Sequence, residues 1–229
     1  MKTKREHLGK NSQESGNILV YVLIAVALFA ALGFTVSRQT QNSSTSELDK
    51  AKAEFFATQL ISYASQTKSV IDQMMFTGTS IDELDFVTPE ESGFNTSPHI
   101  HKVYHPEGGG LSPANLPALA MNQITTTPEP AGWYLGRFNN IEWTNTTGTD
   151  VMLTAHQISK QVCALINEKV TGSKTIPAIS TEVTNYLIDT ATDTELTATA
   201  CASCEGYMSL CVSNAAATAF SFYTVLADR

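Results

Sequence analysis

The most apolar stretch of the chain lies close to its N-terminus. Residues 18–36 read ILVYVLIAVALFAALGFTV, nineteen positions without a charged side chain or a proline. Because an α-helix rises about 1.5 Å per residue, this stretch is long enough to cross the roughly 30 Å hydrocarbon core of a bilayer. The pattern therefore predicts a transmembrane helix over residues 17–37.

Beyond a polar patch at residues 39–46, apolar side chains return at the spacing of a helix with one apolar face. They recur at intervals of three, four and seven positions, as Phe56, Leu60, Tyr63, Val70 and Met74. No proline falls between residues 17 and 88. We therefore expect one helix from residue 17 to about residue 76, with a transmembrane first half and an amphipathic second half that lies on a globular body.

The next part of the chain combines one short predicted helix with a long loop region. Ser80 and Glu83 have the spacing of a capping box, which predicts a short helix up to about Phe86. Residues 90–130 hold most of the prolines and a run of three glycines at 108–110. This composition is typical of turns and irregular surface structure.

The C-terminal half has the pattern of a small antiparallel sheet with one extra helix. Bulky and β-branched residues, typical of strands, occupy residues 132–138, 141–147, 151–157 and 220–229. Residues 158–170 instead show a helical apolar face, with Ser159 as the expected N-cap and Gly172 as the stop. Residues 175–200 show no clear pattern. The predicted fold class is therefore α+β.

Charge is distributed unevenly around the predicted transmembrane helix. The whole chain carries a formal net charge of −8, but residues 1–16 carry +2, which leaves −10 for the remainder. A basic segment before an apolar helix predicts a cytoplasmic N-terminus and a domain on the opposite side of the membrane. The acidic balance also argues against nucleic acid as a partner, because phosphate binding requires a basic surface.

The junction between the charged leader and the apolar stretch resembles a type IV prepilin signal. The leader ends at Gly16, and the apolar run follows at Asn17 and Ile18. The resemblance implies that a prepilin peptidase cuts after Gly16 and that the new terminus at Asn17 is N-methylated. The chain departs from the family by having Asn17 in place of Phe or Met, and Tyr21 in place of the usual Glu at the fifth mature position. Some minor, tip-located pseudopilins also lack this Glu.

The resemblance implies a fold, an organisation and a function. The expected domains are a basic leader (1–16), a transmembrane helix (17–37) and an extracytoplasmic α+β domain (38–229). In such a pilin-like fold, the long N-terminal helix packs on a small antiparallel sheet with an extra helix. Short pieces elsewhere, HPEGGG, NNIEW and VCALIN, are similar to those of uncharacterised bacterial pilin-like proteins.

The implied function is that of a minor pilin or pseudopilin in a type IV pilus or a type II secretion-like filament. Its partners would be the prepilin peptidase, the membrane, and other pilin subunits that contact the N-terminal helix. The protein would lie in the inner membrane as a single-pass protein with a periplasmic or extracellular domain. Two other interpretations of the N-terminus are an uncleaved signal anchor and a removable secretory signal peptide.

Four cysteines lie on the predicted outer side, where an oxidising compartment favours disulfides: Cys163, Cys201, Cys204 and Cys211. We expect one of Cys201 and Cys204 to pair with Cys163 and the other with Cys211, because Cys201 and Cys204 are too close in sequence to be easy partners. The alternatives are a redox pair at Cys201-x-x-Cys204 and a zinc site that includes Cys211 and a histidine.

Few other motifs indicate chemistry. His99, His101 and His105 form an H-x-H-x₃-H pattern, which is compatible with metal binding but equally with a surface loop. The sequence contains no nucleophile elbow and no HExxH motif. We therefore predict no enzyme, no cofactor and no metal. The alternative function is a signal-anchored periplasmic binding or thiol-redox module that does not polymerise.

Overall fold

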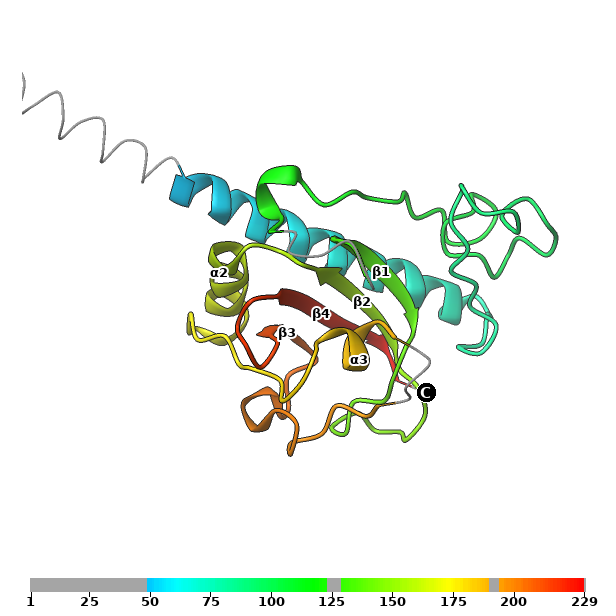
Figure 1. Ribbon diagram of the computed structural model, residues 1–229. Coiled ribbons are helices and arrows are strands. Elements are labelled where there is room, and N and C mark those ends of the chain that lie inside the picture. Colours follow the sequence, from blue (N-terminus) through cyan, green and yellow to red (C-terminus); the bar gives the residue numbers. More distant parts are fainter. Residues whose placement is uncertain (1–48, 123–128, 190–193, 229) are drawn as a thin grey trace, which may run out of the picture. The chain divides into compact units, whose positions relative to one another are not determined.

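The computed structural model describes residues 49–122, 129–189 and 194–228 (Figure 1). The chain divides into two units, residues 1–50 and 51–229, and the fold given below is that of the second unit. None of the helices among the described residues has both the length and the apolar character needed to cross a membrane. The predicted cleavage site at Gly16 and Asn17 and the predicted transmembrane helix at 17–37 lie outside the described residues.

The second unit contains one antiparallel sheet of four strands and several helices, which confirms the α+β class. A long helix covers residues 51–76 of this unit and ends at Phe76, where the sequence predicted its end. The later elements are η1 (Ala118–Ala120), β1 (Gly132–Arg137), β2 (Val151–His156), α2 (Lys160–Thr171), α3 (Thr184–Leu187), η2 (Ala202–Cys204), β3 (Ser209–Ser213) and β4 (Phe220–Ala227). The strand order is β1-β2-β4-β3, so β2 and β4 form the centre of the sheet.

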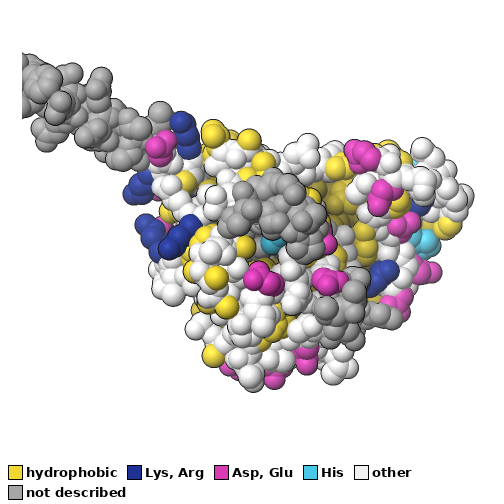
Figure 2. Space-filling model, in the orientation of Figure 1, with side chains coloured by type: hydrophobic (Ala, Val, Ile, Leu, Met, Phe, Trp, Pro, Cys, Tyr) yellow, Lys and Arg dark blue, Asp and Glu magenta, His cyan; other side chains and the backbone are white. Residues whose placement is uncertain are grey.

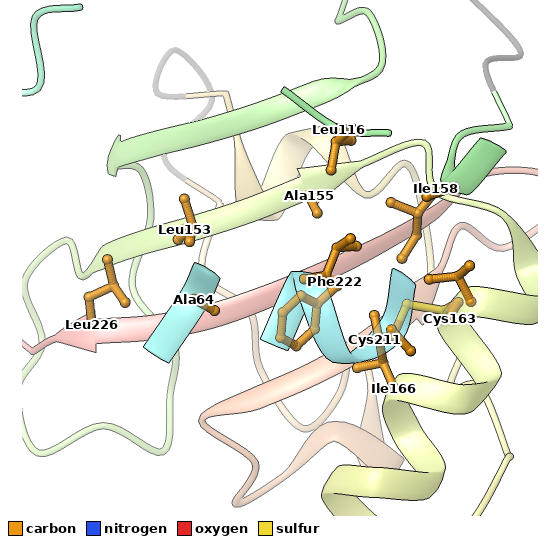
Figure 3. Packing of buried hydrophobic residues seen from close by; sticks show 14 of the residues in the cluster. Ala64, Leu116, Leu153, Ala155, Ile158, Cys163, Ile166, Cys211, Phe222 and Leu226 are labelled. Atoms are coloured by element: carbon orange, nitrogen blue, oxygen red, sulfur yellow. A yellow bond between two sulfur atoms is a disulfide. The ribbon is translucent and has the colours of Figure 1, made fainter. Parts of the chain in front are cut away.

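The long helix packs on the sheet through a narrow stripe of mostly small residues. Its buried positions repeat at alternating intervals of four and three: Ala53, Ala57, Leu60, Ala64, Thr67, Ile71 and Met74. Figure 3 shows Ala64 beside Leu153 of β2 and Leu226 of β4. Alanine side chains allow the helix backbone to come close to the sheet, because they fill little of the space between the two layers. The larger predicted residues Phe56 and Tyr63 flank this stripe and are half-buried.

The sheet is covered on both of its faces. Every residue of β2 and β4 is buried. On β2, Leu153 belongs to the core cluster that includes the long helix and α2, whereas Met152 belongs to a second cluster that includes α3. Successive side chains of a strand point to opposite faces, so the alternating pattern of β2 serves two cores rather than one core and solvent.

Local sequence signals predicted some elements correctly. Helix α2 begins after Ser159, whose Oγ accepts a hydrogen bond from the backbone N–H of Val162 at 3.4 Å. It ends at Gly172, whose φ of 79° is the left-handed conformation that glycine adopts without a steric penalty. Strands β1, β2 and β4 also lie where they were predicted.

Other predicted elements are wrong. The Ser80–Glu83 pair forms, with the Ser80 backbone N–H donating to Glu83 Oε2 at 3.0 Å, but it closes a turn and no helix follows. Residues 142–148 form turns rather than a strand. Strand β3 was not predicted. It is only five residues long, and its pairing with β4 depends on a hairpin that the sequence does not mark with a recognisable turn motif.

Candidate functional site

One disulfide joins α2 to the edge of the sheet. Cys163 lies on α2 and Cys211 on β3, both are fully buried, and their Cα atoms are 5.4 Å apart. This distance is within the range that a disulfide requires. Figure 3 shows both residues among the apolar side chains between α2 and the sheet.

A buried asparagine strengthens the same junction. Asn167, one turn after Cys163 on α2, accepts a hydrogen bond from the Cys211 N–H and donates to the Cys211 carbonyl, each at 2.8 Å. Its amide also donates to the Thr175 carbonyl at 2.9 Å. Asn167 therefore pairs with the β3 backbone in the way that a neighbouring strand does. No sequence pattern marks this role, since Asn167 lies among the apolar residues of the α2 face.

The second disulfide lies within one turn of chain. Cys201 pairs with Cys204 across η2, where the turn brings their Cα atoms to 5.3 Å. All four cysteines are thus in disulfides, as predicted, but the predicted pairing is wrong: neither Cys201 nor Cys204 bonds to Cys163 or Cys211. The expectation failed because the 3-10 turn brings close neighbours in sequence into bonding distance.

The burial of Cys201 and Cys204 bears on the redox interpretation. The two residues are 4% and 0% exposed and belong to the second core cluster, beside Leu210 and Tyr223. A redox-active pair needs a sulfur atom that another thiol can reach. The geometry at η2 therefore favours a structural disulfide that holds the loop before β3 on the core.

The three predicted histidines do not converge on one point. The rings of His99 and His105 stack with their centroids 4.1 Å apart and their planes at 8°, and Phe94 contacts the His105 ring. His101 faces another way, with its Nδ1 3.4 Å from Thr79 Oγ1. Within residues 49–122, 129–189 and 194–228, no group of three His, Cys, Asp or Glu side chains is placed to hold a metal ion.

A buried lysine occupies the centre of the same loop region. Lys102 is 3% exposed, and its Nζ donates to the carbonyl oxygens of Gly93 at 2.6 Å, Phe94 at 2.9 Å and Thr96. Three backbone oxygens around one ammonium group satisfy both the charge and its three donors. The burial of Lys102 was not predicted, because a single lysine in a loop belongs to no sequence pattern.

A buried histidine and serine form a pair on the sheet. His156 Nδ1 lies 2.8 Å from Ser221 Oγ, and burial lowers the pKa of the imidazole to about 4. The two residues are 3% and 0% exposed. A nucleophilic serine must reach a substrate, so this pair has the chemistry of a structural hydrogen bond rather than that of a catalytic dyad.

A cavity of about 420 Å³ lies along the long helix, between its outer face and the start of β1. We call it the aromatic groove and define it by six of its residues: Phe55, Gln59, Tyr63, Gln66, Asn115 and Trp133. The Tyr63 and Trp133 rings contact each other, with centroids 5.0 Å apart. A second cavity of about 470 Å³ adjoins the groove and shares Tyr63, Asn115 and Trp133 with it.

Hydrogen bonds and burial hold the wall of the groove in place. The Tyr63 hydroxyl donates to the Ser112 carbonyl at 3.3 Å, which ties the long helix to the segment that carries Asn115. Burial raises the pKa of Tyr63 and of Tyr104, which lines the second cavity, so both phenols stay neutral at physiological pH. The groove is the largest departure from sequence expectation, because its residues come from three separate segments.

Comparison of the chain with protein families, with curated proteins and with solved structures finds no match.

Proposed function

We propose that this chain is a minor pilin or pseudopilin, a structural subunit of a type IV pilus or a type II secretion-like filament. The observation that carries the proposal is the charged leader that ends at Gly16, directly before nineteen uncharged residues. In this proposal, the helix at 17–37 spans the inner membrane, and the domain lies on the periplasmic or extracellular side. Filament assembly, through contacts between N-terminal helices, is the activity.

The shape of the long helix supports this role. One face packs on the sheet through the stripe from Ala53 to Met74, while the opposite face stays open. On the open side, Phe55 is 65% exposed, and Phe76 at the helix end is 91% exposed. In this proposal, these two side chains are contact points for neighbouring subunits. Neighbouring subunits would therefore find an accessible helix face with apolar anchors.

Two further features are compatible with an extracytoplasmic subunit. Both disulfides require an oxidising compartment to form and persist. Figure 2 shows most of the visible Lys and Arg side chains at the end of the domain where the long helix begins, while Asp and Glu are spread over the rest of the visible face. The basic end is the one at which the polypeptide enters the domain.

The decisive measurement is the N-terminus of the protein recovered from membranes of its own host. We expect intact mass and N-terminal sequencing to give a mature chain that starts at Asn17 with a methyl group on its amine. A Gly16→Arg variant should remain uncleaved, because the peptidase requires a small residue before the cut. A Gly9→Arg variant, which adds the same charge within the leader, should be processed normally.

Two results would contradict the proposal. Normal cleavage of the Gly16→Arg variant would remove the prepilin interpretation. An unprocessed start at Met1 in the wild-type protein would leave an anchored domain without a filament.

The alternative function is a signal-anchored binding module, and the aromatic groove is the observation that favours it. The thiol-redox form of this alternative has less support, because the sulfur atoms of Cys201 and Cys204 lie in the core. The two functions differ in where the protein is found. A filament subunit should appear in filaments sheared from cells, whereas an anchored module should stay entirely in the membrane fraction.

A further inference from the structure

The aromatic groove combines flat rings with uncharged polar groups. Phe55, Tyr63 and Trp133 supply the rings, and Gln59, Gln66 and Asn115 supply carboxamides. Hydroxyls of Thr58 and Ser62 also line it, and none of its described lining residues is Lys, Arg, Asp or Glu. The groove therefore offers apolar surface and neutral hydrogen-bonding groups side by side.

The polar groups of the groove are available to a ligand. Among the described residues, the carboxamides of Gln59, Gln66 and Asn115 and the indole N–H of Trp133 make no hydrogen bond with the protein. The other tryptophan is different, because the Trp143 indole donates to the Tyr207 carbonyl at 3.0 Å. Carboxamides both donate and accept, so the groove can satisfy a ligand that needs both.

The rings of Tyr63 and Trp133 are already held in place in the unbound protein. The Tyr63 hydroxyl is tied to Ser112, and its ring contacts Trp133, which itself belongs to β1 of the sheet. A site on rigid elements loses little conformational freedom on binding. The groove volume of about 420 Å³ also falls within the range that is usual for small-molecule sites.

The lining excludes most other ligand classes. Among the described lining residues, an anionic ligand would find no cation, and it would meet Glu90 in the adjoining cavity. A purely apolar ligand would match the rings but would leave the carboxamides and hydroxyls beside them unused. A sugar ring fits both features: its C–H faces pack on aromatic rings, and its hydroxyls donate to and accept from the amides around them.

We propose that the aromatic groove binds a neutral oligosaccharide, with Trp133 and Tyr63 as stacking surfaces and Asn115 as a hydrogen-bonding group. This inference goes beyond the proposed function and does not depend on it. The groove is formed by residues of a single copy of the chain, so a protein that is not in a filament can be tested for it. A subunit with such a groove would give a filament affinity for glycan surfaces.

The chain offers a clean fluorescence assay, because it has only two tryptophans. In a Trp143→Phe variant, Trp133 is the sole indole reporter, and the Tyr207 carbonyl still accepts a hydrogen bond from Tyr223 at 2.9 Å. A Trp133→Phe variant is the matched control with a reporter outside the groove. The full chain is studied in a detergent without a sugar headgroup, so that the detergent does not compete.

The probes are neutral tetrasaccharides of glucose and of N-acetylglucosamine, together with a sulfated oligosaccharide and a proline-rich peptide. We expect a saturable fluorescence change in the Trp143→Phe variant with one of the neutral sugars, at a Kd on the order of 0.1–1 mM. The Trp133→Phe variant should give no change. The sulfated sugar should not bind, because no Lys or Arg is among the described lining residues of the groove.

Calorimetry with single variants then assigns the contacts. Trp133→Ala should weaken sugar binding by about tenfold or more, and Asn115→Ala by a few-fold, while Trp143→Ala should leave it unchanged. If the Trp133→Ala variant does not fold, Trp133→Phe replaces it. Because phenylalanine retains a ring, this variant should keep part of the affinity for the sugar. Circular dichroism checks that each variant is folded.

Three outcomes would overturn the proposal. The first is the absence of saturable binding of any neutral sugar up to about 10 mM. The second is sugar binding that survives Trp133→Ala in a folded protein, which would place the sugar elsewhere. The third is binding of the peptide but not of the sugars, which would make the groove a protein-interaction site.

Discussion

The loop segment 79–112 and the sheet differ in what lies at their centre. The loop segment contains the buried Lys102 ammonium, whereas the sheet lies between two clusters of apolar side chains. The Lys102 ammonium gathers carbonyl oxygens from residues 93–96, and Gly109 donates to the Lys102 carbonyl at 3.0 Å. A Cβ atom at Gly108 would overlap the carbonyl oxygens of His99 and Lys102, so this packing needs glycine. In the sheet, by contrast, β2 and β4 bury every residue.

The two regions therefore depend on different kinds of interaction. Hydrophobic burial in the sheet is spread over many residues and two clusters, so no single contact defines its geometry. The loop segment is held by backbone hydrogen bonds of its turns, and one side chain satisfies further carbonyls. We expect damage in the sheet region to spread to the whole domain and damage at Lys102 to stay local. Three measurements test this difference between the two regions.

The largest effect should come from the disulfide that joins α2 to the sheet. Cys163 and Cys211 are separated by 48 positions, so loop-closure entropy predicts that a Cys163→Ala/Cys211→Ala variant loses about 4 kcal/mol of unfolding free energy. The disulfide between Cys201 and Cys204 spans a separation of only 3 positions, so a Cys201→Ala/Cys204→Ala variant should lose about 2 kcal/mol of unfolding free energy. Urea unfolding of both variants measures the difference. Equal losses of unfolding free energy would show that the Cys163–Cys211 disulfide does not stabilise the domain more than the local one does.

An intermediate effect should appear in the pH dependence of sheet stability. The folded pKa of His156 is about 4, below the ordinary unfolded value of about 6.5, because the imidazole is buried beside Ser221 and the Tyr134 ring. Between these values the unfolded state binds a proton that the folded state does not. Stability should therefore fall as the pH drops from 6.5 towards 4, and stay constant above 6.5 with respect to this group.

The expected size follows from the same two pKa values. Between about pH 7.5 and about pH 4.5, His156 alone should remove roughly 2–3 kcal/mol of unfolding free energy. Urea unfolding of wild type and of His156→Gln at both pH values separates this contribution from that of the carboxyl groups. An identical pH slope in the two proteins would show that His156 is not buried in its neutral form.

The smallest global effect should come from Lys102→Met. We expect a loss of about 1–2 kcal/mol, because carbonyl oxygens of residues 93–96 lose their donor while the sheet keeps its packing. Hydrogen exchange should become fast in residues 93–111 and remain slow in β2 and β4. Lys174→Met is the matched control, since Lys174 forms only a half-exposed pair with Glu168 and should change stability little. Loss of exchange protection throughout the sheet would contradict a local role for Lys102.

The sequence predicted best those elements whose signals lie within a few residues of one another. Helix α2 was predicted with both ends, because Ser159 and Gly172 act within one turn of the helix. The stripe of the long helix was predicted less well. The prediction placed large residues such as Phe56 on the buried face, whereas the buried positions include Ala57 and Ala64. Alanine carries almost no hydrophobic signal, although it decides how closely the helix approaches the sheet.

The candidate site was predicted less completely than the fold. The four cysteines were correctly expected in disulfides, because compartment and number suffice for that prediction. Their pairing was wrong, since it depends on which segments meet in space. The aromatic groove was not predicted at all. Tyr63, Asn115 and Trp133 are far apart in the chain, and each is unremarkable in its own segment.

The amino-acid sequence alone was sufficient to predict the α+β class, the amphipathic long helix and the presence of disulfides. These features follow from composition and from periodicity over a few residues. Only the tertiary structure decided that Cys163 meets Cys211, that Lys102 binds three carbonyl oxygens, and that three segments form one groove. Such contacts join residues distant in the chain, and their geometry arises when the elements pack, so no local pattern encodes it.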